Sequence, residues 1–185
     1  MRSYNLTSKI TPLKALVLDV DGVLTPGGIW YSDTGDQFKK FDVKDGLGIV
    51  ALGKLGIRTA IITGKESQLL EKRAGELRVS ALYQNRPYKI PALREFAAKF
   101  DLELSEIGFV GDDIIDIPVM ELCGFSACPS DAVQQVQKTA DWVARSPGGN
   151  GALREIVDII VSAKTGLYPP DEFFIEWAKE IQSLR

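Results

Sequence analysis

The sequence of 185 residues contains no histidine and only two cysteines. Without an imidazole the chain cannot build a Ser-His-Asp hydrolase, a Cys-His hydrolase or a histidine-rich zinc site, so acid–base chemistry falls to carboxylates, lysine or tyrosine. Two thiols cannot by themselves form an all-cysteine zinc site. A basic surplus is missing as well, because the formal net charge is -3. This argues against a nucleic-acid-binding protein, which normally carries a basic stripe.

Long apolar runs are also absent, and no stretch approaches the ~20 apolar residues that span a bilayer. The first apolar run, 15–18, is short and ends at Asp19, which is unlike a signal peptide. Cys123 and Cys128 lie in apolar surroundings, as buried thiols in a reducing compartment do. We therefore expect a cytoplasmic protein that contacts neither membrane nor nucleic acid.

With 45% hydrophobic and 25% charged residues, the composition fits one soluble globular domain over residues 1–185. Short runs rich in Val, Ile and Leu alternate with longer amphipathic segments, which predicts an α/β, Rossmann-like fold of three layers with a central parallel sheet. The expected strands are 15–19, 59–63, 81–84, 107–111, 125–127 and 142–143. The expected helices are 46–54, 66–77, 90–100, 115–122, 132–139 and 152–163.

Two segments stand outside this alternation. Residues 25–41 hold two β-prone runs around the turn signal 33–35, which predicts a projecting hairpin. Its aromatic side chains would bury against the domain or against another subunit: Trp30, Tyr31, Phe38 and Phe41. The C-terminal tail, about 165–185, contains a predicted amphipathic helix over 171–184, which either reaches an adjacent active site or packs on the surface.

Polar residues follow four of the expected strands. They are Asp19 and Asp21 after the first, Thr63 and Gly64 after the second, Lys89 after the third, and Asp112, Asp113 and Asp116 after the fourth. Each group alone has an ordinary structural explanation as a helix cap, a partner of the helix dipole or a solvated charge. The carboxyl ends of parallel strands meet at one edge of a sheet, however, so the set together predicts a site for phosphate chemistry.

This set resembles the four motifs of the haloacid dehalogenase superfamily of phosphotransferases. The motifs read Asp19-Val-Asp-Gly-Val-Leu-Thr25, Thr63, Lys89 and Gly111-Asp-Asp-Ile-Ile-Asp116. Cleaving a phosphomonoester without histidine needs a nucleophile that is already ionised, and Asp19 would supply it by forming an aspartyl-phosphate. Asp21 would protonate the leaving alkoxide and later activate water. Thr63 and Lys89 would bind the phosphoryl oxygens and balance charge.

Carboxylates gathered around a phosphate dianion need a cation to neutralise them. A hard divalent ion with oxygen ligands, most plausibly Mg²⁺, is therefore implied. The family pattern would hold it by Asp19, by the backbone carbonyl of Asp21 and by Asp112. Asp113 and Asp116 would support it through water or orient Lys89.

Response-regulator receivers also combine Asp, Thr, Lys and Mg²⁺, but there the phosphorylated Asp follows the acidic pair on a later strand. The order in this sequence argues against a receiver. Larger superfamily members insert a cap domain on either side of Thr63, and here the two intervals leave no room for one. The enzyme would therefore be capless, with an open site that neighbouring subunits are best placed to cover.

Among capless members, the sequence is similar to 3-deoxy-D-manno-octulosonate 8-phosphate phosphatases. The similar segments include Phe41-Asp-Val-Lys-Asp-Gly46, Ile61-Ile-Thr-Gly64, Pro118-Val-Met120 and Gly148-Gly-Asn-Gly-Ala-Leu-Arg-Glu155. The resemblance implies a homotetramer in which hairpins meet and each site is completed by a neighbour. It also implies substrate contacts from Asp42, Val43, Lys44, Asp45, Gly46, Gly64, Lys65 and Arg73.

Two departures keep alternatives open. Lys65 stands where the family usually has arginine, and Val50 stands where many members have another arginine. Lys is a point charge, whereas Arg is a bidentate carboxylate partner. A related branch acts on nine-carbon 2-keto-3-deoxy sugar acid phosphates, and Lys65 keeps that substrate in play. A non-catalytic scaffold related to sugar-acid cytidylyltransferases is a further alternative. The loop 148–151 is equally consistent with a phosphate cradle and with a plain turn before a helix.

Overall fold

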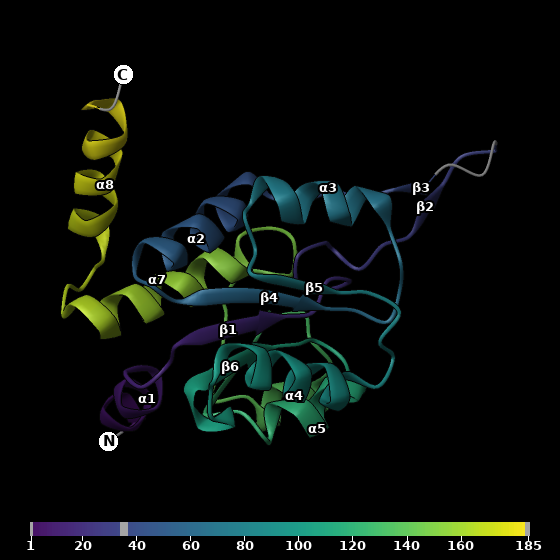
Figure 1. Ribbon diagram of the computed structural model, residues 1–185, viewed down its shortest axis with the longest axis horizontal. Coiled ribbons are helices and arrows are strands. Elements are labelled where there is room, and N and C mark those ends of the chain that lie inside the picture. The colour runs from purple at the N-terminus through teal and green to yellow at the C-terminus, as the bar shows by residue number, and fades with distance from the viewer. Residues whose placement is uncertain (1, 34–36, 184–185) are drawn as a thin grey trace.

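A parallel sheet of six strands forms the middle layer of the molecule, in the order β5-β4-β1-β6-β7-β8. The computed structural model describes residues 2–33 and 37–183. Helices cover both faces of the sheet (Figure 1), which confirms the expected α/β fold and each expected strand. The strands are β1 (Ala15–Leu18), β4 (Arg58–Ile62), β5 (Ala81–Tyr83), β6 (Ile107–Val110), β7 (Phe125–Cys128) and β8 (Trp142–Val143).

Each face of the sheet has its own core, because neighbouring residues of a strand point to opposite faces. In β1, Leu16 and Leu18 join one cluster of buried side chains, whereas Ala15 and Val17 join the other. The first cluster is covered by α1 (Arg2–Ile10), α2 (Val43–Lys54), α3 (Gln68–Glu76) and α7 (Ala152–Thr165). The second is covered by α4 (Lys89–Phe100), α5 (Ile117–Met120) and α6 (Gln134–Thr139). Strand β1 is thus covered on both faces and paired on both edges, with β4 and β6. The backbone of Asp19, which follows β1, therefore has a fixed position.

The helices differ from the expectation in two places. Helix α1 was not predicted, because its inward apolar pair, Leu6 and Ile10, is too short a pattern to indicate a helix by itself. The expected helix 115–122 divides into a 3₁₀ turn, η2 (Ile114–Asp116), and the short α5. Another 3₁₀ turn, η1 (Leu104–Glu106), precedes β6.

The expected hairpin consists of β2 (Trp30–Tyr31) and β3 (Gln37–Phe38), which pair antiparallel and project beyond the sheet (Figure 1). Residues 34–35 of its expected turn lie outside the described residues. Trp30, Tyr31 and Phe38 are 68%, 66% and 60% exposed, whereas Phe41 packs against the first core cluster. Burial against the domain itself therefore accounts for Phe41 and leaves the other three aromatic side chains uncovered.

The C-terminal helix α8 (Asp171–Ser183) stands apart from the layered body (Figure 1), and residue 184 of the expected helix lies outside the described part. Phe173 and Phe174 pack at the margin of the first core cluster. The guanidinium of Arg154 in α7 lies 4.0 Å from the centre of the Phe174 ring. The tail therefore packs on its own chain at this point, and Arg154 is one of its contacts.

Both cysteines are free, with Cys128 buried and Cys123 half-buried, as expected. Burial raises the pKa of each thiol to about 12, so both stay protonated near neutral pH. Among the described residues, no helix is both long and apolar enough to cross a membrane.

Candidate active site

Four parallel strands bring the polar residues of the sequence motifs to one edge of the sheet. Asp19 follows β1 directly, and its backbone N–H still donates to the carbonyl of Val110 in β6 at 3.0 Å. Thr63 follows β4, the neighbour of β1 on the other side, and its N–H donates to the carbonyl of Tyr83 at 2.9 Å. Lys89 begins α4 after β5, and Asp112 comes two residues after β6. The ladder that aligns the strands therefore also aligns these side chains.

Lys89 is the buried cation of the site, with only 3% of its surface exposed. Its ammonium forms ion pairs with Asp19, at 2.9 Å, and with Asp116. Burial alone would lower the pKa of Lys89, but the carboxylates of Asp19 and Asp116 outweigh burial and raise it. Lys89 is therefore charged at neutral pH and joins the first motif to the last.

Three carboxylates, those of Asp19, Asp112 and Asp116, each offer one oxygen within 4.8 Å of the others. Burial raises the pKa of Asp19 to about 6, with Lys89 opposing and Asp116 adding to the shift. Burial, followed by the charges of Asp19 and Asp116, raises the pKa of Asp112 to about 7. One lysine cannot neutralise three carboxylates, so the cluster carries excess negative charge.

The donor set of this cluster fits a hard divalent cation. Both carboxylate oxygens of Asp116 already accept hydrogen bonds. Oδ1 accepts from Lys89, and Oδ2 accepts from the backbone N–H groups of Asp112, at 3.0 Å, and Asp113, at 3.3 Å. Asp112 differs, since its Oδ1 is buried without a hydrogen-bond partner. A buried carboxylate oxygen without a partner is costly unless a cation binds it. Oxygen ligands of this kind are those that Mg²⁺ prefers.

Glycine makes the close approach of the motifs possible. Gly22 has a φ of +93°, and a Cβ at this position would lie 2.0 Å from Oδ2 of Asp112. A Cβ on Gly111 would lie 2.5 Å from the carboxyl carbon of Asp116. Each glycine therefore lets a loop of one motif touch a carboxylate of the last motif.

The loop 148–151 is also part of this packing. A Cβ on Gly148 would lie 1.8 Å from the carbonyl oxygen of Gly22, and the N–H of Gly149 donates to the carbonyl of Val23 at 2.9 Å. Gly148 itself is held by the carboxylate of Asp131. These contacts show a structural role for the loop: it supports the turn that follows Asp19.

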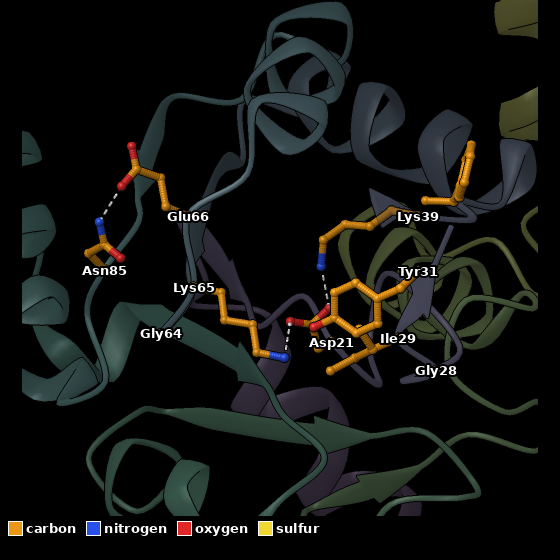
Figure 2. A pocket seen from close by; sticks show the side chains of 10 residues that line it. Asp21, Gly28, Ile29, Tyr31, Lys39, Gly64, Lys65, Glu66 and Asn85 are labelled. Carbon is orange, nitrogen blue, oxygen red and sulfur yellow. Dashed lines mark hydrogen bonds and ion pairs between the residues drawn. The ribbon is translucent and has the colours of Figure 1, made fainter. Parts of the chain in front are cut away.

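Asp21, two residues after Asp19, lines a pocket of about 360 Å³ (Figure 2). Lys39 of the hairpin forms an ion pair with its Oδ1, and Nζ of Lys65 lies 3.8 Å from its Oδ2. Asn85 and Glu66 are hydrogen-bonded to each other across the pocket from Asp21. The lining comes from the hairpin, the loop after β4 and the loop after β5: Asp21, Gly28, Ile29, Tyr31, Phe38, Lys39, Gly64, Lys65, Glu66 and Asn85.

The expected substrate-binding residues fall into two groups. Gly64 and Lys65 line this pocket. The others lie where α2 begins and along α3. Asp42 caps α2 through the N–H of Lys44, Val43 is 81% exposed, and buried Asp45 accepts from the N–H groups of Gly151 and Arg154.

Arg73 of α3 lies against Gly46, where a Cβ would come within 2.2 Å of its Nη2. Asp113 turns outward and caps η2. Within the described part of the chain, residues 42–46 and Arg73 therefore lie apart from the pocket beside Asp21.

Sequence reasoning overlooked several residues that line the pocket. Lys39, Tyr31, Glu66 and Asn85 belong to no motif and reach the pocket only because the hairpin folds toward Asp21 and the loops after β4 and β5 meet. One signal was available for Lys39: neighbouring residues of an extended segment point to opposite sides, so alternation separates Lys39 from Lys40. In the structure Lys40 indeed turns away to Asn150.

The comparisons with known proteins agree with this geometry. Residues 78–156 match the family described as haloacid dehalogenase-like hydrolases. The 3-deoxy-D-manno-octulosonate 8-phosphate phosphatase KdsC of Escherichia coli (strain K12) is 38% identical over 162 residues, which cover 88% of this chain and 86% of that protein.

Two solved structures are similar over most of their length. The phosphatase of that name from Moraxella catarrhalis, in complex with magnesium ion, phosphate ion and KDO, has a TM-score of 0.88 and 35% identity, covering 93% of this chain and 97% of that one. The cobalt-bound form from Haemophilus influenzae has a TM-score of 0.82 and 33% identity, covering 85% and 92%.

Fold and site together define a haloacid dehalogenase-like enzyme that hydrolyses phosphoric monoesters. Within that class, the chain belongs to the 3-deoxy-D-manno-octulosonate 8-phosphate phosphatase family.

The carboxylate cluster predicts an unusual pH dependence for the metal-free protein. The pKa values of Asp19 and Asp112 are raised to about 6 and about 7, above the value of about 3.9 for an unfolded Asp. Between these limits the folded state binds more protons than the unfolded state, so the free energy of unfolding should fall as the pH rises from about 4 to about 7. Urea unfolding in excess EDTA measures this dependence. The other carboxyl groups titrate mainly near pH 4, and the chain has no histidine, so the part of the window between about pH 5.5 and 7 is the most diagnostic.

The matched variant is Asp112→Asn, which removes one of the repelling charges. Without metal at pH 7.5 it should be more stable than the wild type, and its stability should depend less on pH. Mg²⁺ at about 100 times its Kd should stabilise the wild type by about 2.7 kcal/mol and should leave the variant nearly unchanged. A variant with the same pH dependence and the same response to Mg²⁺ as the wild type would contradict the assignment of the cluster.

Proposed function

We propose that this enzyme hydrolyses 3-deoxy-D-manno-octulosonate 8-phosphate to the free sugar acid and phosphate through an aspartyl-phosphate on Asp19. The observation that carries the proposal is the convergence of Asp19, Lys89 and Asp112 at one sheet edge, with Asp21, two residues after Asp19, lining a pocket. Family membership supports the substrate, since the E. coli relative bears this name and the M. catarrhalis structure holds KDO and phosphate.

The reaction has two steps, and each has a residue to perform it. A carboxylate oxygen of Asp19 attacks phosphorus, the bond from phosphorus to the sugar oxygen breaks, and Asp21 gives its proton to the departing oxygen. A water molecule then attacks the aspartyl-phosphate, gives a proton to Asp21 and releases phosphate. Lys89, bound to Asp19, would offset the charge that develops on the phosphoryl oxygens.

Thr63 would orient the phosphoryl group. Its side chain is buried, with 3% exposure, and its Oγ1 accepts from the N–H of Lys65 at 3.4 Å. A hydroxyl that accepts from the backbone keeps its own O–H as a donor. We therefore assign Thr63 a hydrogen bond to a phosphoryl oxygen.

Magnesium is the cofactor of this site. Asp19, Asp112 and the backbone carbonyl of Asp21 would hold it. Oδ1 of Asp112 is buried without a hydrogen-bond partner, so binding Mg²⁺ would compensate its desolvation. When bound, Mg²⁺ supplies Lewis-acid stabilisation of negative charge on the phosphoryl oxygens. Asp116, which is taken up by Lys89 and two backbone N–H groups, would keep Asp112 in place.

The activity test compares the wild type with Asp19→Asn. The wild type should release phosphate from 3-deoxy-D-manno-octulosonate 8-phosphate only with Mg²⁺, and the variant should lose at least about four orders of magnitude in kcat, because the amide is no nucleophile. A phosphate-release assay with and without EDTA measures both. No turnover of any phosphomonoester by the wild type would instead favour the non-catalytic scaffold.

The same assay decides between sugar acids of eight and nine carbons. Lys65 lines the pocket where relatives usually have arginine, so the nine-carbon acid phosphate is the second candidate. We expect the higher kcat/KM for the eight-carbon substrate. A higher kcat/KM for the nine-carbon substrate would instead assign this enzyme to the phosphatases of nine-carbon 2-keto-3-deoxy sugar acid phosphates.

We also propose a homotetramer in which the hairpins meet and neighbouring subunits cover the open site. The support is the exposure of Trp30, Tyr31 and Phe38 on the hairpin next to the pocket, which is unusual for large aromatic side chains on an isolated domain. The free cysteines, one buried and one half-buried, are consistent with a cytoplasmic location, which we retain as part of the proposal.

Trp30→Lys tests the assembly, because a charge in an apolar contact between subunits is costly to desolvate. Analytical ultracentrifugation should show a tetramer for the wild type and smaller species for the variant, together with lower kcat/KM. Leu122→Ser is the control, since Leu122 is exposed beside α5, away from the hairpin, and its assembly should be unchanged. A wild-type monomer with full activity would be incompatible with the proposed cover.

A further inference from the structure

Lys39 is a charged residue beside Asp21, and the reaction steps proposed above assign it no role. It follows β3 of the hairpin, and its side chain is only 14% exposed. Its ammonium forms an ion pair with Oδ1 of Asp21 (Figure 2). The adjacent Lys40 points the other way and contacts Asn150. At the base of the hairpin, Lys39 therefore binds Asp21 and Lys40 binds Asn150 of the loop 148–151.

The two oxygens of Asp21 are in different surroundings. Oδ1 accepts a hydrogen bond from Lys39, whereas Oδ2 lies 3.8 Å from Nζ of Lys65. That distance is too long for a hydrogen bond. In Figure 2 both lysines reach Asp21 from the walls of the pocket. Oδ1 is the oxygen of Asp21 that the described structure shows in a side-chain hydrogen bond, so we take Oδ2 as the oxygen for proton transfer.

We propose that Lys39 is a positioning residue that fixes Asp21 by Oδ1, so that Oδ2 carries the transferred proton. This inference rests on the proposed function, in which Asp21 is the acid and base. As the bond between phosphorus and the ester oxygen breaks, the proton on Oδ2 passes to that oxygen. In the second step Oδ2 takes a proton from the attacking water. Lys39 keeps its own protons and donates to Oδ1 in both steps.

The ion pair also ties catalysis to the hairpin. A free aspartate side chain samples several rotamers, and a misplaced catalytic group costs much of its effect. Because Lys39 is part of the hairpin, the position of the hairpin decides which rotamer Asp21 adopts. Proton transfer would therefore depend on hairpin placement even if no hairpin residue touched the reacting atoms.

The test uses two aryl phosphates that differ in how much they need an acid. Phenolate is a strong base, like the tyrosine side chain with its pKa of about 10, and leaves slowly without a proton, whereas p-nitrophenolate leaves readily. General acid catalysis contributes roughly 10²–10⁴-fold, so Lys39→Met should lower kcat/KM for phenyl phosphate by at least about tenfold. The same variant should lower kcat/KM for p-nitrophenyl phosphate by less than about threefold.

Three controls separate positioning from other roles of Lys39. Lys138→Met, at an exposed position of α6, should leave both values within about twofold of the wild type. Lys39→Arg should recover part of the loss with phenyl phosphate. In an Asp21→Asn background, Lys39→Met should add little further loss, because its partner is already changed.

Equal losses with both aryl phosphates would mean that Lys39 binds phosphate or only supports the fold, and no loss would mean that the ion pair is idle. Either result would overturn the proposal. Neither probe is a sugar acid, so the outcome is independent of the substrate assigned above. If the wild type cleaves aryl phosphates and not the octulosonate phosphate, the proposed substrate fails while the role of Lys39 is still decided.

Discussion

The repulsion among three carboxylates, two of them buried and one half-buried, is the constraint on which the rest of this structure depends. Asp19, Asp112 and Asp116 approach within 4.8 Å, and the described structure places a single buried lysine among them. The enclosed strand β1, the two close-packed glycines and the supporting loop 148–151 all hold this cluster together against its own charge. A protein keeps such an unfavourable arrangement where it serves binding or catalysis. Here the cluster contains one buried oxygen, Oδ1 of Asp112, that has no hydrogen-bond partner and is suited to bind a cation.

The sequence predicts the sheet and the motif residues well because both follow from local rules. Apolar runs of β-branched residues define the strands, and parallel strands must end at one edge, so Asp19, Thr63 and Asp112 could be placed together before any coordinates. Glycine at 22 and 111 belongs to the same motifs, yet the reason for it, a carboxylate where the Cβ would be, appears only in three dimensions.

The remaining features depend on tertiary contacts that no local pattern encodes. Helix α1 is stabilised by packing of Leu6 and Ile10 on the first core cluster. The loop 148–151 looks like a phosphate cradle or a turn in the sequence, and only its contact with Gly22 identifies it as a support. Lys39 lies eighteen residues from its partner Asp21, so the ion pair forms only where the base of the hairpin comes close to the turn after β1. Residues 42–46 and Arg73 resemble a binding segment, and their contact with substrate stays a prediction. Within one chain, Asp45 accepts from the N–H groups of Gly151 and Arg154, and Val43 is exposed.

The most direct test of the account is to trap the phosphoryl group on its acceptor. With Asp21→Asn and p-nitrophenyl phosphate, the first step needs no acid but the second lacks its base, so the aspartyl-phosphate should accumulate. Stopped-flow absorbance should show a burst of about one p-nitrophenolate per site, and mass spectrometry after acid quench should find the phosphoryl group on the peptide that contains Asp19. A phosphoryl group on any other residue, or turnover by this variant with none on Asp19, would contradict the central claim.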